Sequence, residues 1–152
     1  MNKTRRKIIH AGAGIGVFGW ARVVSAAEGG YDIALALAIK QYVGEATVRV
    51  GKVKLEVAEL VENGNTVPVS VAVESPMTAT EHVKSIALFN ERNPQRDVAR
   101  FTLGPRSGRA VVATRIRLAT SQKLVAIAQL SDGSYWSHST DVIVTLAACV
   151  ES

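Results

Sequence analysis

Residues 52–73, K-V-K-L-E-V-A-E-L-V-E-N-G-N-T-V-P-V-S-V-A-V, decide the fold. Apolar and polar residues alternate through Lys52–Val61 and again through Val67–Val73, which is the period of a β-strand with one buried face. Asn63-Gly64, between the two runs, is typical of a tight hairpin turn, because both residues tolerate a positive φ. Pro68 cannot donate a ladder hydrogen bond and places the second strand at an edge or a bulge. The stretch therefore predicts a β-hairpin.

Similar strand signals continue to the end of the chain. Asn93-Pro94, Gly104-Pro105 and Asp132-Gly133 mark turns between them. Together with the first two strands, the further strands predict an all-β fold, an immunoglobulin-like seven-stranded β-sandwich. The chain has a single cysteine, so no disulfide can join the two sheets and apolar packing must hold them. The further strands are expected at Val83–Phe89, Val98–Leu103, Val111–Leu118, Lys123–Leu130 and Asp141–Leu146.

A short helix is expected ahead of the sandwich. After a Gly29-Gly30 linker, the alanine-rich run 33–43 is helical in composition and stops before Gly44. Its apolar residues spread around much of the helix surface, so we expect it to pack on the domain or on a partner. Asp32 and Lys40 argue against a second membrane span.

The first 26 residues resemble a twin-arginine signal peptide. A charged start containing Arg5-Arg6 precedes a weakly apolar run, and small residues follow, with cleavage expected after Ala26 or Ala27. The apolar run is too short and too rich in glycine to span a membrane. We therefore expect a periplasmic protein that is exported folded and has no membrane segment after cleavage. An ordinary secretory signal, the alternative, also leads out of the cytoplasm.

The charge distribution gives no indication of nucleic-acid binding. The chain has 18 Lys and Arg residues and 13 Asp and Glu residues. Five of the basic residues and none of the acidic ones lie in the first 26 residues, so the remainder is balanced. The body therefore lacks the basic patch expected of a nucleic-acid-binding protein.

The predicted organisation ends in a short tail that carries the only cysteine. It comprises a signal peptide (1–26), a linker and helix (27–44), the sandwich (45–146) and the tail (147–152). If Leu146 is the last anchored residue, Cys149 lies up to about 10 Å from the body. A lone cysteine after a strand is often a small buried hydrophobe. A terminal position in an exported protein instead favours an exposed working thiol or an intermolecular bond.

The sequence shows no catalytic constellation and no metal-binding pattern. His82 and His138 are far apart, without ligand spacing. We expect His138 to belong to a loop cluster with Tyr135-Trp136, and the alternative is a position close to the Cys149 thiol. Arg115 and Arg117 alternate on one strand, where a solvated face is favoured over an anion site. We expect no cofactor and no catalytic residue.

Five stretches together resemble the SoxY family of sulfur-oxidation carrier proteins. Their order and spacing agree with the family from about residue 45 to 149, and so does the leader. The stretches are A-E-L-V-E-N-G-N-T-V-P-V-S-V-A-V-E-S-P-M (58–77), N-E-R-N-P (90–94), T-R-I-R-L-A-T-S-Q (114–122), S-D-G (131–133) and V-I-V-T-L ahead of the terminal cysteine (142–146).

The resemblance implies a function. Proteins of this family are immunoglobulin-like sandwiches that pair with SoxZ, a second small sandwich protein, and work in the periplasm during thiosulfate oxidation. The terminal cysteine, here Cys149, carries the sulfur compound as a covalent adduct, which is a thiosulfonate, a cysteine persulfide or a longer sulfane chain. Enzymes of the thiosulfate-oxidising complex load it, hydrolyse off sulfate and oxidise the remaining sulfur. The protein would thus be a carrier and not an enzyme.

The tail departs from the family pattern Gly-Gly-Cys-Gly-Gly. The residues flanking the carrier cysteine are Ala147, Ala148, Val150 and Glu151, so the glycines that give the arm freedom are absent. Val150 is stiff at χ1. Glu151 places a negative charge beside the thiol, which disfavours a thiolate and repels an anionic adduct.

Three hypotheses follow. The protein is a carrier that holds thiosulfate-derived or sulfane sulfur on Cys149. Alternatively, it is a divergent partner-binding module that pairs with a SoxZ-like protein without turning over sulfur. The third possibility is a covalent dimer joined through Cys149. Candidate partner surfaces are the exposed sheet edges and the Asn90–Gln95 loop.

Overall fold

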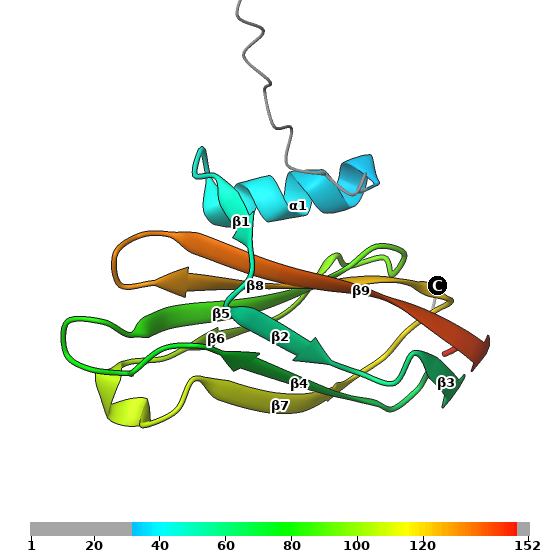
Figure 1. Ribbon diagram of the computed structural model, residues 1–152. Helices are drawn as coiled ribbons and strands as arrows, with labels where there is room; N and C mark the ends of the chain where they lie inside the picture. Colours follow the sequence, from blue (N-terminus) through cyan, green and yellow to red (C-terminus); the bar gives the residue numbers. More distant parts are fainter. Residues whose placement is uncertain (1–31, 149–152) are drawn as a thin grey trace, which may run out of the picture.

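A computed structural model describes residues 32–148 of the chain as a β-sandwich covered on one side by a helix (Figure 1). The predicted signal peptide, most of the linker, and Cys149, Val150 and Glu151 lie outside these residues. The elements are α1 (Ile33–Val43), β1 (Val48–Val50), β2 (Val53–Glu56), β3 (Leu60–Asn63), β4 (Val67–Val73), β5 (Val83–Asn90), β6 (Asp97–Thr102), the 3-10 helix η1 (Pro105–Ser107), β7 (Val111–Ile116), β8 (Gln122–Leu130) and β9 (Tyr135–Leu146).

Two sheets form the sandwich. The larger has the order β1-β9-β8-β5-β6, with β3 also paired to β9, and the smaller has the order β2-β4-β7. This confirms the predicted all-β sandwich with a short N-terminal helix. In the part of the chain that the structure describes there are nine strands, where the sequence analysis expected seven.

The additional strands arise because the chain changes sheets within the predicted strand 52–61. Its first half, β2, pairs with β4 in the small sheet, and its second half, β3, runs parallel to β9 in the large one. The short β1 pairs in parallel with the start of β9. A regular alternation of residues does not reveal such a crossing, because both halves keep one buried face.

The predicted hairpin at Asn63-Gly64 is therefore wrong. A turn does follow β3, and the Asn65 amide donates to the Asn63 Oδ1 at 2.9 Å. The strands on either side of it belong to different sheets, however, and β4 pairs with β2 and β7. Neither Asn63 nor Gly64 is among the residues with positive φ, so the glycine serves another purpose, described below.

The main core lies between the two sheets and is made largely of valine, leucine and isoleucine. Each strand of the small sheet points alternate residues inward, as in the buried Val67, Val69 and Val71 of β4. Full burial of such a side chain contributes about 1.5–3 kcal/mol. This packing holds the two sheets together without a disulfide.

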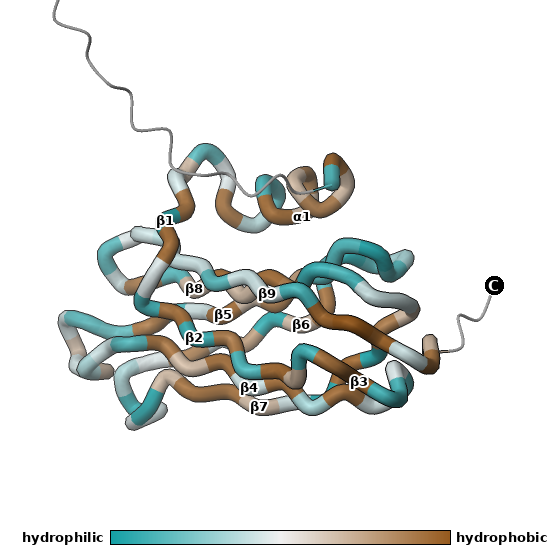
Figure 2. The backbone as a smooth tube through the Cα atoms, turned by 45° about the vertical axis from the view of Figure 1, so that its right-hand side comes forward, coloured by the Kyte–Doolittle hydropathy of each residue, from teal (hydrophilic) through white to brown (hydrophobic). Residues whose placement is uncertain are grey.

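A second core lies between α1 and the outer face of the large sheet. Leu35 and Ile39 of the helix pack with Phe89 of β5 and Val125 of β8. The two central strands are thus buried on both faces, which explains their nearly continuous apolar sequences. Figure 2 shows these apolar segments between α1 and the small sheet. Among the described residues, no helix has the length and hydropathy needed to span a membrane.

Tyr42 fixes the C-terminal half of α1 on the sheet. Its ring packs against Phe89 and Tyr135, with centroids 5.8 and 5.7 Å away. Its hydroxyl lies 2.6 Å from the Ser85 Oγ, and Arg100 lies over the ring. Burial raises the pKa of the Tyr42 hydroxyl above its ordinary value of 10.0.

We expect Tyr42→Phe to lower the free energy of unfolding by about 1 kcal/mol at pH 7, because it removes the hydrogen bond to Ser85. Because the pKa of Tyr42 is higher in the folded than in the unfolded state, its neutral hydroxyl stabilises the fold at pH values below the unfolded-state pKa. This stabilisation is lost as the pH rises through the folded-state pKa. The difference between wild type and variant should therefore shrink above about pH 10. Urea titrations at neutral and alkaline pH measure both effects.

Ser85→Ala is the matched control, because it removes the same hydrogen bond but keeps the phenol. It should cost a similar amount at pH 7 and retain the alkaline loss of stability. If Tyr42→Phe lost as much stability at alkaline pH as wild type does, this account of Tyr42 would be contradicted.

Candidate functional site at the exit of the C-terminal tail

The C-terminal tail leaves the body at one end of the sandwich, where β9 ends beside β3 (Figure 2). Two connections cross between the sheets at this end, from β3 to β4 and from β7 to β8. Ala147 is exposed, whereas Ala148 is buried, with 6% of its surface accessible. The predicted carrier Cys149 and its neighbours Val150 and Glu151 follow directly, outside the described residues.

Backbone hydrogen bonds tie these three segments together. The Gly64 amide donates to the Leu146 carbonyl at 2.8 Å, and the Leu118 amide donates to the Gly64 carbonyl at 2.8 Å. The Ala148 amide in turn donates to the Leu118 carbonyl at 3.1 Å. We call these four residues the tail clasp. The clasp fixes the point from which the last four residues depart.

The clasp requires a glycine at position 64. A Cβ there would lie 2.3 Å from the Leu118 carbonyl oxygen, 2.9 Å from the Ala148 nitrogen and 3.1 Å from the Val144 Cγ1. The first two neighbours are backbone atoms, which have little room to move. Gly64 thus permits a close approach of three chain segments and does not serve a hairpin turn.

The clasp makes the arm shorter than the sequence suggested. The expectation of about 10 Å rested on Leu146 as the last anchored residue. Ala148 is both buried and hydrogen-bonded, so the Cα of Cys149 lies one peptide unit, about 3.8 Å, beyond an anchored Cα. The last anchored residue that the structure describes is therefore Ala148 and not Leu146.

A polar cluster supports the connection that carries Leu118. The Asn93 Oδ1 accepts hydrogen bonds from the Ala119 amide at 3.0 Å and from the Gln122 Nε2 at 2.7 Å. The Asn93 Nδ2 donates to the Arg117 carbonyl at 2.7 Å, and the buried Gln122 accepts from the Arg92 amide at 2.8 Å. The Asn90–Gln95 loop, expected as a possible partner surface, thus also braces the clasp.

Four of the five family-like stretches meet at this end of the molecule. The first supplies Gly64, the second Asn93 and the third Leu118, and the last, V-I-V-T-L, leads into Leu146. The third and the last are also joined directly, because the Val144 amide donates to the Ser121 Oγ at 2.8 Å. The sequence analysis found these stretches but not their convergence, because no single one signals a long-range contact.

The remaining stretch, S-D-G, forms the turn between β8 and β9 at the other end of β9. The Asp132 carboxylate accepts bonds from the Ser134 hydroxyl at 2.6 Å and amide at 2.9 Å. These bonds lower the pKa of Asp132, with a smaller effect of the positive charges of Lys52 and Arg49. The role of this stretch is to start β9 in register.

His138 lies away from the tail exit. The prediction of a loop cluster at Tyr135-Trp136-His138 is wrong, because all three belong to β9. The His138 Nδ1 accepts the Leu55 amide at 3.0 Å and so joins β2 to β9. Leu146 is eight positions further along the same extended strand, which is a distance of about 26 Å. Among the described residues there is no group of three or more potential metal-ligating side chains.

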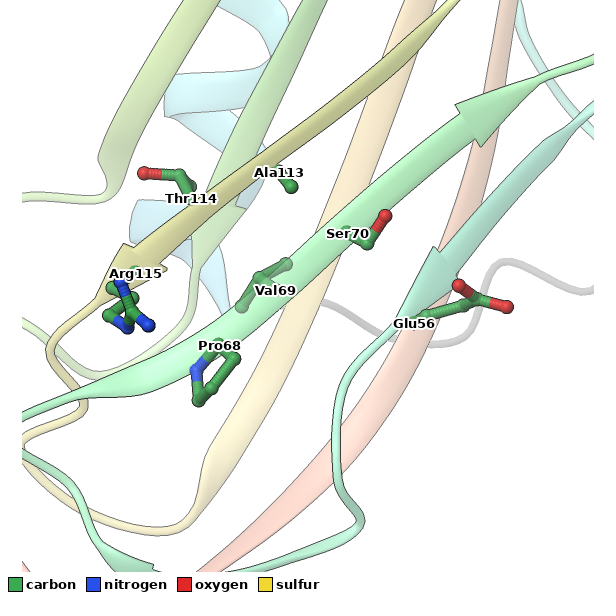
Figure 3. Close-up of a pocket in the computed structure, with 7 residues that line it drawn as sticks. All are labelled: Glu56, Pro68, Val69, Ser70, Ala113, Thr114 and Arg115. Carbon is green, nitrogen blue, oxygen red and sulfur yellow. The ribbon is translucent and has the colours of Figure 1, made fainter.

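A shallow hollow lies on the outer face of the small sheet. It is lined by residues of β2, β4 and β7 that include Glu56, Ser70 and Arg115 (Figure 3). Arg115 is exposed on this face, and so is Arg117 beyond the end of β7. Their exposure agrees with the expected solvated face. The hollow is wide open and contains charges of both signs, so it does not define an anion site.

The fold and site define a small β-sandwich protein whose C-terminal arm is anchored on the body immediately before a cysteine. The sequence model described as Sulfur oxidation protein SoxY matches residues 39–149. The chain belongs to the SoxY family. Cys149 is the last residue of the matched range. Among curated proteins, none matches the chain.

A solved SoxY structure agrees with this assignment, and two other solved structures are similar in fold alone. The sulfur carrier protein SoxY from Chlorobium limicola f thiosulfatophilum is 29% identical, with a TM-score of 0.63, over 74% of this chain and 96% of that one. A superoxide reductase (neelaredoxin) from Ignicoccus hospitalis shares only the fold, at 23% identity and a TM-score of 0.55, over 62% and 80% of the two chains. A putative superoxide reductase from Thermotoga maritima also shares only the fold. It is 21% identical, with a TM-score of 0.54, over 65% of this chain and 93% of that one.

We expect Gly64→Ala to destabilise the protein by about 1–3 kcal/mol, because the new methyl group overpacks against fixed backbone atoms. Opening of the clasp should also expose the Ala148 amide. Thermal unfolding measures the first effect, and hydrogen exchange of the Ala148 amide measures the second.

Gly104→Ala is the control. A Cβ there has no atom within 4 Å, and Gly104 has an extended φ of -151°. This variant should be neutral or slightly stabilised, because alanine restricts the unfolded chain. Equal stability and equal amide protection in the two variants would show that the clasp does not depend on Gly64.

Proposed function

We propose that this protein carries sulfur covalently on Cys149 and presents it to the enzymes of periplasmic thiosulfate oxidation. The observation that carries the proposal is the placement of the only cysteine of the chain at the last residue of the family match, one residue after the clasped Ala148. Membership of the family supports a sulfur-carrier role. The twin-arginine-like leader supports a periplasmic location.

The proposed cycle has two steps, loading of the thiol and hydrolysis of the adduct. In loading, the Cys149 thiol and thiosulfate form a sulfur–sulfur bond and yield a thiosulfonate, one proton and two electrons, which a partner oxidoreductase accepts. In hydrolysis, water attacks the sulfonate sulfur and breaks its bond to the sulfane sulfur. This step yields sulfate, two protons and a deprotonated persulfide on Cys149. The carrier itself supplies the thiol and its position, and its partners supply the chemistry.

The protein would work as a heterodimer with a SoxZ-like sandwich protein. Open sheet edges are available for such a partner, because β6 and β7 each pair on one side only within the described part of the chain. A stable subunit partner would cover an edge of this kind and leave the tail exit free.

A divergent partner-binding module is the second candidate. The observation that favours it is the tail, in which alanines replace the glycines before the cysteine and Glu151 follows it. Such a protein would form the heterodimer but keep an unmodified thiol.

The test is the intact mass of the mature protein from its host grown on thiosulfate, with and without reductant. We expect a reductant-labile gain that matches one or more sulfur atoms or a thiosulfonate group and maps to Cys149. Cys149→Ser, produced in the same way, should show none. An unmodified thiol under these conditions would leave the partner-binding module, and a reducible dimer alone would indicate a covalent structural role.

A further inference from the structure

The two sheets differ in how their outer faces are covered. Within residues 32–148, α1 covers the outer face of the large sheet, and no element covers the outer face of the small sheet (Figure 1). An antiparallel sheet that faces water normally carries polar residues at its outward positions. Here four of the six outward residues of β4 and β7 are apolar, namely Pro68, Ala72, Val111 and Ala113. This composition favours contact with another protein surface.

The outward residues belong to one face, because they lie at alternate positions and are paired across neighbouring strands. The pairs are Pro68–Arg115, Ser70–Ala113 and Ala72–Val111 between β4 and β7, and Glu56–Ser70 between β2 and β4. We call the outward residues of β2, β4 and β7 the small-sheet face. The shallow hollow lies on this face.

Charges of opposite sign stand at the two edges of the small-sheet face. Glu56 on β2 and Arg115 on β7 lie on opposite sides of the hollow (Figure 3). The Glu56 side chain is 54% exposed, and its Oε1 lies 2.6 Å from the Lys54 Nζ. Within the described residues, the Glu56 Oε2 has no partner and the exposed Arg115 makes no ion pair. One edge thus offers a carboxylate oxygen and the other an unpaired guanidinium.

This arrangement of charges is complementary to itself. Both β2 and β7 are antiparallel to β4, so they run in the same direction. A two-fold axis parallel to the strands stacks two small-sheet faces and places β7 of one copy over β2 of the other. Arg115 then lies over the edge that carries Glu56 of the second copy, displaced by two residues, about 7 Å, along the strand. An axis across the strands would instead place β7 over β7 and leave Arg115 without a carboxylate.

The area of the small-sheet face fits a reversible contact. Its strands have four, seven and six residues. Three strands of this length, spaced about 4.8 Å apart, cover roughly 300 Å². A stable interface buries about 800 Å² per partner. A contact through this face is therefore expected to dissociate on dilution.

We propose that the small-sheet face binds a second copy of this chain, with Arg115 of each copy opposite Glu56 of the other. The tail clasp lies just beyond the end of β7, where Leu118 follows Ile116. Because the axis is parallel to the strands, the two clasps lie at the same end of the dimer. The inference adds self-association to the proposed carrier function and does not rest on it.

The experiment measures the dimer dissociation constant of the full chain by sedimentation equilibrium, with a reductant present to prevent a disulfide through Cys149. The variants are Arg115→Glu, Glu56→Arg and the double variant Glu56→Arg/Arg115→Glu. Each single reversal places like charges opposite each other twice in the dimer, so we expect the dissociation constant to rise at least about tenfold. The double variant restores opposite charges if the two edges meet across a two-fold axis. Its dissociation constant should therefore return to within about threefold of wild type.

Lys84→Glu is the matched control. It changes the net charge by the same amount as Arg115→Glu, at an exposed position of β5 in the large sheet. Its dissociation constant should match that of wild type. All the substituted side chains are exposed, so the melting temperatures should also stay close to that of wild type.

Three results would overturn the proposal. The first is a monomeric wild type at every concentration at which the protein is soluble. The second is a dimer that neither single reversal weakens, because another surface would then hold it. The third is a double variant that is as weak as the single ones, because the opposing charges would then not be those of a second copy. Sulfur loading of Cys149, measured on the same protein, is independent of these results, so each proposal can fail while the other stands.

Discussion

The close backbone contact at Gly64 determines how the sandwich closes at the end from which the tail departs. Three segments that are far apart in the sequence meet there, and each is fixed by a hydrogen bond to the next. The space between them admits no Cβ, so the contact depends on the absence of a side chain. Because two of these segments connect the two sheets, the same contact sets the relation between the sheets and the position of the arm. The geometry of the functional end thus follows from one steric constraint.

The rest of the fold makes that end rigid. No disulfide is possible, but the large sheet is packed on both faces, by the small sheet on one side and by α1 on the other. The polar cluster around Asn93 holds the connection that carries Leu118. Together with the clasp, these contacts hold the last described residues of the tail against the body.

The sequence predicted the features that depend on local patterns. Alternation predicted β4 to β8 to within a few residues, because a strand with one buried face has apolar residues at every second position. The alanine-rich composition of residues 33–43 predicted α1. It failed where long-range contacts decide. The change of sheet after β2, the purpose of Gly64 and the place of His138 in β9 all depend on segments far away in the chain. The candidate site was found from the family-like stretches, but its anchoring at Ala148 could not be read from them.

The alanines of the tail have a physical consequence that goes with the clasp. A Gly-Gly arm samples many conformations and loses that freedom when an enzyme binds it, whereas alanine restricts the free arm and reduces the loss. The buried methyl group of Ala148 also packs at the root, where glycine would have none. A stiffer arm that is anchored next to the cysteine has less reach, but it loses less conformational freedom on binding. This favours reaction when the partner is already correctly placed.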